Sequence, residues 1–182
     1  MKNVLYTLLL ILAISLNLKA QSFMTENGKA IFHSEVPLHT FSGSSEHLVG
    51  MINLETKVVD FYLDLTTLDS GIQKRDRDMR ETLKTDKYPF AEFYGKIISD
   101  FDLNSSSIQK VLVKGSFKIH GVEKEKEFSG TLKITSEGLL LTGNWILRLE
   151  DYDIEPPSLL FVKVDQEQKI EIEALLKPTI EE

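Results

Sequence analysis

Apolar and polar residues alternate along almost the whole chain after its first twenty residues. In the clearest stretch, every second residue from Val111 to Ile119 is apolar or glycine. A β-strand points successive side chains to opposite faces of its sheet, so this pattern predicts strands with one apolar and one polar face. The apolar faces of many such strands must enclose a common interior, and that interior is where we look for a function.

Eight segments show this strand pattern, and turn residues such as Gly138 separate them. The predicted strands are residues 29–36, 48–54, 58–65, 92–98, 111–119, 127–134, 139–149 and 169–176. Short hairpin links join most of them, so we predict an all-β fold, an eight-stranded antiparallel barrel without exposed sheet edges. A sandwich is the alternative, although it usually needs longer crossing connections.

Residues 73–84 interrupt the alternation with charged residues and good helix formers, and Met79 and Leu83 lie four positions apart. This pattern predicts a short helix or an irregular loop across one end of the barrel. The pair Pro156-Pro157 excludes a helix and a central strand, so we expect residues 154–162 to form a loop near one rim.

Residues 1–20 have the features of a secretory signal peptide. Lys2 precedes an uncharged apolar run over residues 4–16, and Ala20 offers a small residue for cleavage. The alternative is an uncleaved anchor, although the run is shorter than the roughly 20 residues of a membrane span. We therefore expect one domain, residues 21–182, that is periplasmic or secreted and has no integral membrane segment after cleavage.

Composition excludes several classes of partner and chemistry. The chain has no cysteine, which excludes disulfides and thiolate metal sites, and its net charge of −7 offers no basic excess for nucleic acid. Anionic membrane surfaces are not expected as partners for the same reason. The sequence does not decide between a monomer and a homodimer.

No residue pattern points to catalysis. The histidines follow no metal-ligand spacing, and we expect them to be solvated or to lie in turns. They are His33, His39, His47 and His120. Glu123, Glu125 and Glu127 share one strand face, which is typical of an exposed, solubilising edge rather than an acid–base pair. We therefore expect no enzymatic activity, no metal and no cofactor.

Three motifs in order resemble the YceI-like family. Residues 119–122 (IHGV) with Lys124 resemble the I-H-G-V-x-K turn of that family. Residues 75–80 (RDRDMR), followed by Tyr88-Pro89 and Phe93, are similar to its R-D-x-x-L-R…Y-P-x-x-x-F stretch, and residues 151–154 (DYDI) to its D-Y-x-I turn. The resemblance implies a lipocalin-like barrel with an elongated apolar interior, which in some relatives holds a polyisoprenoid chain.

The inward positions of the predicted strands are the candidate ligand-binding residues. They are Phe61, Leu63, Phe93, Ile97, Val113, Gly115, Phe117, Phe128, Leu132, Gly143, Trp145 and Leu147. A barrel of eight strands can be filled by its own side chains or can keep room for one ligand, and the pattern alone leaves both open. Inward glycines at positions 95, 115, 130 and 143 relieve crowding, permit bends or leave room for a ligand.

The glycines and the resemblance together favour non-catalytic binding or carriage of an isoprenoid or fatty acyl lipid. The alternative is a solid, stress-related module that binds a protein through its outer surface. Arg75 and Arg80 are candidates for contact with an anionic head group. The other interpretation of these arginines is pairing with Asp76, Asp78 and Glu81 on a solvated helix.

Overall fold

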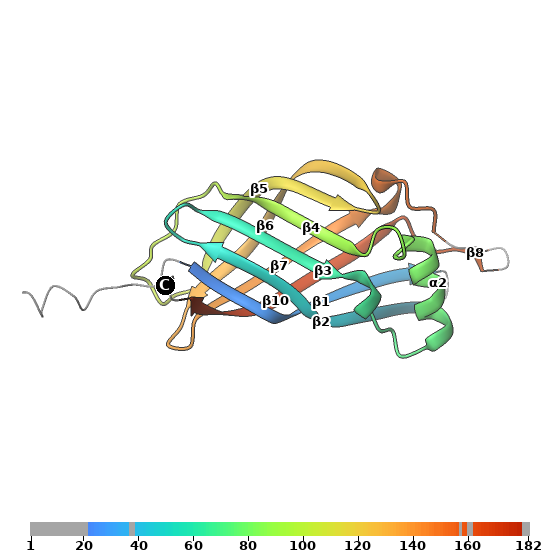
Figure 1. Ribbon diagram of the computed structural model, residues 1–182, viewed down its shortest axis with the longest axis horizontal. Helices are drawn as coiled ribbons and strands as arrows, with labels where there is room; N and C mark the ends of the chain where they lie inside the picture. The colour runs from blue at the N-terminus through green and yellow to red at the C-terminus, as the bar shows by residue number, and fades with distance from the viewer. Residues whose placement is uncertain (1–21, 37–38, 157, 160–161, 180–182) are drawn as a thin grey trace, which may run out of the picture.

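The computed structural model describes residues 22–36, 39–156, 158–159 and 162–179. The predicted leader and Pro157 lie outside the described residues. Among the residues described, eight long strands close into an antiparallel barrel in the order β1-β10-β7-β6-β5-β4-β3-β2, which confirms the predicted fold (Figure 1). They are β1 (Ser22–Val36), β2 (His39–Asn53), β3 (Val58–Asp64), β4 (Phe90–Ile97), β5 (Gln109–Ile119), β6 (Val122–Ile134), β7 (Leu139–Arg148) and β10 (Glu167–Thr179).

Three strands begin five or more residues earlier than the alternation predicts. The register between β1 and β2 shifts around Gly28, and such a bulge breaks the period of two on which the prediction depends. The first half of β2 is rich in serine and glycine and has no apolar alternation to detect. Strand β6 begins at Val122. The prediction began at residue 127 because lysines, which interrupt the apolar alternation, occupy two inward positions before it.

Short elements cover the end of the barrel that Figure 1 places on the right. The helix α2 (Gln73–Leu83) lies across this end, as predicted, and Lys84 ends it in a left-handed conformation. The 3-10 helix η1 (Leu65–Thr67) precedes α2, and the 3-10 helix η2 (Leu149–Tyr152) follows β7. The two-residue strands β8 (Ser158–Leu159) and β9 (Val162–Lys163) pair within the predicted rim loop. No helix in the described part of the chain is long and apolar enough to cross a bilayer.

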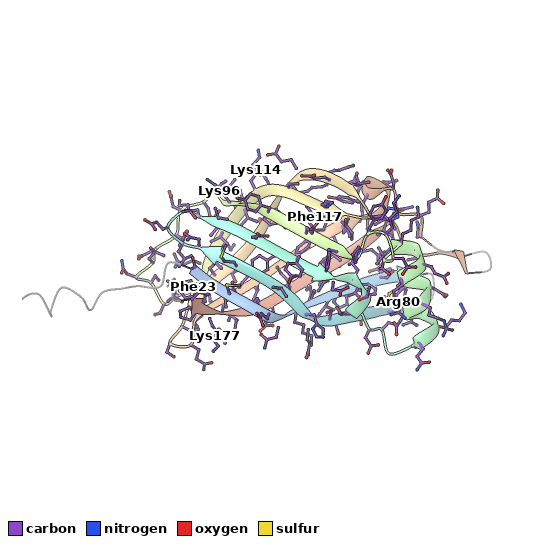
Figure 2. All side chains as sticks on the ribbon, viewed as in Figure 1. Phe23, Arg80, Lys96, Lys114, Phe117 and Lys177 are labelled. Atoms are coloured by element: carbon purple, nitrogen blue, oxygen red, sulfur yellow. The ribbon has the colours of Figure 1, made fainter. Side chains whose placement is uncertain are left out.

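The opposite end of the barrel is filled by aliphatic side chains. Ile52, Leu139 and Leu176 are at most 1% exposed there. Figure 2 shows Phe23 near this packed end and Arg80 at the α2 end. Free space inside the barrel therefore has to lie between the packed end and α2.

In two places, neighbouring strands of the barrel stop pairing before they reach the α2 end. Strands β2 and β3 pair only through residues 48–52 and 59–63, and β6 and β7 only through residues 130–134 and 139–143. The segment with η1 and α2 lies against the first half of β2, where Ser44 and Asp69 exchange backbone hydrogen bonds. The 3-10 helix η2 lies at the second separation, where Asp151 bonds Lys124 and Lys126 of β6.

Candidate functional site

A cavity of approximately 430 Å³ occupies the middle of the barrel and extends to α2. Aliphatic and aromatic side chains from all eight long strands line it, so the lumen is not filled by the protein's own side chains. Every predicted interior residue except Gly115 belongs to this lining: Phe61, Leu63, Phe93, Ile97, Val113, Phe117, Phe128, Leu132, Gly143, Trp145 and Leu147.

The inward glycines have two different roles. Gly95 and Gly115 face each other across β4 and β5, and a Cβ on Gly115 would collide with the backbone of Tyr94 and Gly95. These two glycines therefore allow two strands to approach closely. Gly143 differs, because a Cβ there would meet only the side chain of Ile172 at 3.2 Å and the backbone carbonyl of Ser129 at 3.9 Å. Gly143 lines the cavity and leaves space in it.

An aromatic cluster packs against one side of the cavity. The ring centroid of Phe117 lies 5.7 Å from that of Phe128, 6.4 Å from Trp145 and 5.6 Å from Tyr152. The rings of Phe128 and Trp145 are 4.7 Å apart, and Phe93 contacts Phe128 edge to face. Such contacts stabilise beyond the burial of area, so the rings form an apolar wall that packs well.

The cavity opens beneath α2, where polar side chains join the apolar lining. Arg75, Asp78 and Thr82 of α2 line the cavity, and the guanidinium of Arg75 lies 4.4 Å from the ring centroid of Phe41. Arg80, the second predicted head-group residue, does not belong to this lining. Asp78 forms an ion pair with Lys74 at 2.7 Å.

A buried carboxylate fixes the start of α2. Asp76 is 8% exposed and accepts hydrogen bonds from the backbone amide of Ser70 at 2.9 Å and its hydroxyl at 2.6 Å. Burial acts to raise the pKa of Asp76, but these hydrogen bonds and the charges of Arg80 and Arg75 together hold it below the ordinary value. Asp76 is therefore an ionised anchor for α2.

Sequence reasoning missed the cluster around η2. Lys124 and Lys126 hydrogen-bond the carboxylate of Asp151 at 3.3 and 3.2 Å, and Tyr152 is 1% exposed beneath them. Burial and the Asp151 charge raise the pKa of Tyr152 to about 12. The lysines at inward positions of the alternation were the signal for this arrangement.

The histidine prediction is correct in part. His120 lies in a turn, with φ of 55°, but it is only 6% exposed and its Nδ1 lies 3.0 Å from the carbonyl oxygen of Tyr152. His47 is exposed, His33 lies 3.6 Å from a Glu171 carboxylate oxygen, and the side chain of His39 lies outside the described part of the structure. Among the described residues, no group of three or more acidic or histidine side chains could hold a metal ion.

The structure agrees with the prediction for the glutamates of β6. Glu123, Glu125 and Glu127 are exposed on the outer face of the part of β6 that pairs with β5 but not with β7. Ser116 of β5 donates a hydrogen bond to Glu123, and Lys114 forms an ion pair with Glu127 at 3.4 Å. These charges belong to the solvated outer wall.

Comparisons with known proteins agree with this architecture. The family model for the YceI-like domain matches residues 19–176. A polyisoprenoid-binding domain from Saccharophagus degradans superposes with a TM-score of 0.76 at 16% identity, covering 88% of this chain and 100% of that one. BcnA from Burkholderia cenocepacia superposes with a TM-score of 0.67 at 14% identity, covering 84% of this chain and 96% of that one.

The YCEI protein of Campylobacter jejuni has a TM-score of 0.51 at 15% identity, with coverage of 86% of this chain and 85% of that one. No match was found among curated proteins. At these identities the solved structures establish a shared fold.

Proposed function

This chain belongs to the YceI-like family, and we propose that its barrel binds an elongated apolar lipid, an isoprenoid or a fatty acyl chain, and carries or sequesters it without catalysis. The observation that carries this proposal is the apolar cavity of approximately 430 Å³ that runs from the middle of the barrel to α2. The structural similarity to a polyisoprenoid-binding domain supports it. The alternative, a solid barrel filled by its own side chains, does not agree with a cavity of this size.

Apolar burial alone is sufficient for useful affinity. A chain that buries about 500 Å² gains roughly 12 kcal/mol at about 25 cal/mol per Å². Association and ordering of the chain offset roughly 4 kcal/mol or more of this gain. Micromolar binding, about −8 kcal/mol, is therefore within reach without a hydrogen bond. Neighbouring chain lengths should be discriminated weakly, because one methylene contributes only about 1 kcal/mol.

Lys74 and Arg75 of α2 both line the cavity, and since Lys74 is ion-paired with Asp78, we assign contact with an anionic head group to Arg75. It lines the cavity at the α2 end, and stacking on Phe41 holds its guanidinium at the opening. Replacing Arg75 by Ala should weaken binding of a fatty acid while leaving binding of the matching fatty alcohol unchanged. Arg80→Ala is the control, because Arg80 lies on the same helix outside the lining. Equal losses for acid and alcohol would refute this role of Arg75.

A carrier of this kind fits export through the leader predicted at residues 1–20. In the periplasm or outside the cell it would keep an apolar chain out of water. The packed end of the barrel closes one side of the cavity, so the chain would lie along the barrel with its head toward α2.

Intact-mass measurement tests the proposal. The protein, purified without detergent, should show an added mass under native conditions that organic extraction removes and that contains an isoprenoid or acyl chain. Gly143→Leu should lower the bound fraction at least about tenfold, about 1.4 kcal/mol, because the leucine fills the cavity. Ile146→Leu on the outer face of the same strand should bind normally. A wild-type protein that carries and retains no added lipid would refute the proposal.

A further inference from the structure

The barrel wall between β6 and β7 lacks strand pairing over much of its length. The ladder that begins at Ile134 and Leu139 ends at the pair Gly130 and Gly143. From there to the α2 end, β6 pairs only with β5, and β7 pairs only with β10. The two strands therefore leave an opening in the wall that other elements must cover.

The inner face of β6 is open to solvent at this place. Lys124 pairs with Phe117, which lines the cavity, so the lysine side chain lies on the same inner face. The side chains of Lys124 and Lys126 are nevertheless 40% and 34% exposed. This exposure agrees with the missing ladder between β6 and β7 beside these lysines.

A thin polar latch lies across the opening. The carboxylate of Asp151, on η2, accepts hydrogen bonds from Lys124 at 3.3 Å and Lys126 at 3.2 Å. Both ammonium groups also lie near the face of Tyr152, at 5.7 and 5.8 Å from its ring centroid. Solvent-accessible ion pairs of this kind contribute little to stability and are screened by salt. The latch is therefore easily opened.

The cavity lies behind the rings beneath this latch: Tyr152 contacts Phe117, and Phe117 lines the cavity. Phe128 and Trp145, one from each side of the opening, line the cavity and stack on each other. Ser129 and Thr142, the neighbours of the last ladder pair, line it as well, so the cavity reaches the wall where pairing ends. The Trp145 indole nitrogen and the Tyr152 hydroxyl are buried without a hydrogen-bond partner among the described residues. Rotation of the Trp145 or Tyr152 ring therefore breaks no side-chain hydrogen bond among the described residues.

We propose that this opening is a side portal through which the apolar chain passes into the cavity, an inference that rests on the proposed function. The portal opens when Lys124 and Lys126 leave Asp151 and the rings of Phe128 and Trp145 rotate apart. The backbone of η2 stays in place, because Leu149 and Ile154 are buried and His120 contacts the Tyr152 carbonyl. The opening beneath α2 is the competing route, and α2 is held by the buried Asp76.

A removable bridge across the portal tests this route. The chain has no cysteine, so Lys126→Cys with Asp151→Cys gives a unique pair that a short dithiol-specific reagent can link and a reductant can release. Lys114→Cys with Glu127→Cys is the matched control, since these residues face each other across β5 and β6 and a bridge between them does not span the opening. The readout is the rate at which dibrominated stearate quenches Trp145.

The bridge across the portal should slow quenching at least tenfold, about 1.4 kcal/mol, and reduction should restore the rate. The bridged control should behave like the unmodified protein. An unchanged rate with the portal bridged overturns the portal and leaves the proposed function standing. If the unbridged protein takes up no lipid at equilibrium, the proposed function fails and the portal fails with it.

A second variant needs no bridge. Asp151→Asn removes the charge that holds both lysines, so uptake should be several-fold faster than in the wild-type protein and independent of salt. Wild-type uptake should accelerate as salt rises from about 0.05 M to about 1 M, because salt screens the latch. Equal rates and equal salt dependence in the two proteins overturn the portal.

Discussion

Two segments cover the barrel where its ladders are incomplete, and different kinds of contact hold each segment in place. The α2 cover, between β2 and β3, is held by polar contacts: paired backbone bonds of 2.9 Å between Ser44 and Asp69, a 2.6 Å bond between the Ser45 and Thr67 hydroxyls, and the buried Asp76. The η2 cover, between β6 and β7, is held by aromatic packing around Phe117 and Tyr152. Its ion pairs lie outside that packing.

This difference indicates how each cover can be loosened. A cover held by a buried carboxylate responds to removal of that group and to acid. A cover held by packed rings responds to truncation of a ring and is indifferent to moderate pH. Four predictions test the comparison, from the largest expected effect to the smallest.

Phe117→Ala should produce the largest loss of stability. Phe117 is 7% exposed and contacts Phe128, Trp145 and Tyr152, so truncation should lower the free energy of unfolding by about 3–5 kcal/mol. Phe41→Ala, beneath α2, should lose less because Phe41 is only partly buried. Urea denaturation measures both, and equal losses would contradict the proposed difference between the covers.

Asp76→Ala should lower the free energy of unfolding by about 1–3 kcal/mol, because Ser70 loses its buried charged partner. Amide hydrogen exchange should become faster in α2 and unchanged in η2. Asp78→Ala is the control on the same helix, since its carboxylate pairs with the exposed Lys74. Uniform acceleration of exchange across the barrel would show that Asp76 does not act on α2 alone.

Acid should weaken the α2 cover. The folded state holds the pKa of Asp76 below its ordinary value of 3.8, so the unfolded chain binds the proton more readily. The stabilisation is fully present above that ordinary value and is lost as pH falls through the lower folded pKa. The difference in unfolding free energy between wild type and Asp76→Asn should therefore shrink in strong acid. A difference that stays constant with pH would contradict an ionised Asp76.

Tyr152→Phe should have the smallest effect at neutral pH. The Tyr152 hydroxyl is buried without a partner among the described residues, so its removal should change the free energy of unfolding by no more than about 1 kcal/mol, toward greater stability. The raised folded pKa of about 12 means that wild type loses stability as pH rises from about 10 to 12. The variant should lose less over that interval, and a clear loss at neutral pH would reveal a missing partner.

The sequence predicts the barrel because alternation survives where both neighbours of a strand are present. Residues 111–119 keep a strict period of two, and the strand matches the prediction to within two residues. Alternation also predicted most of the cavity lining, with Gly115 as an inward position that does not belong to it. Helix α2 was predictable because its charged stretch interrupts the strand pattern.

The covers were not predictable in the same way. In the sequence, Lys124 and Lys126 interrupt the apolar alternation of a strand. In the structure they lie on the inner face, where they bond Asp151, 25 or more residues away in the chain. The polar partner of the buried His120 ring is the carbonyl of Tyr152, 32 residues away in the chain. The bulge near Gly28 shifts the register of β1, so the residues before it do not continue the alternation that predicted the rest of the strand. Each of these features depends on contacts between distant segments, which periodicity within one segment does not record.

Quenching of Trp145 tests most directly whether the lipid lies inside the barrel. Trp145 is the one tryptophan of the chain and it lines the cavity, so its fluorescence reports on the lumen. Dibrominated stearate should quench it saturably in the wild-type protein, unbrominated stearate should compete, and Gly143→Leu should abolish the effect while the protein stays folded. Lipid that binds with no quenching of Trp145 would place the ligand outside the lumen and contradict the account.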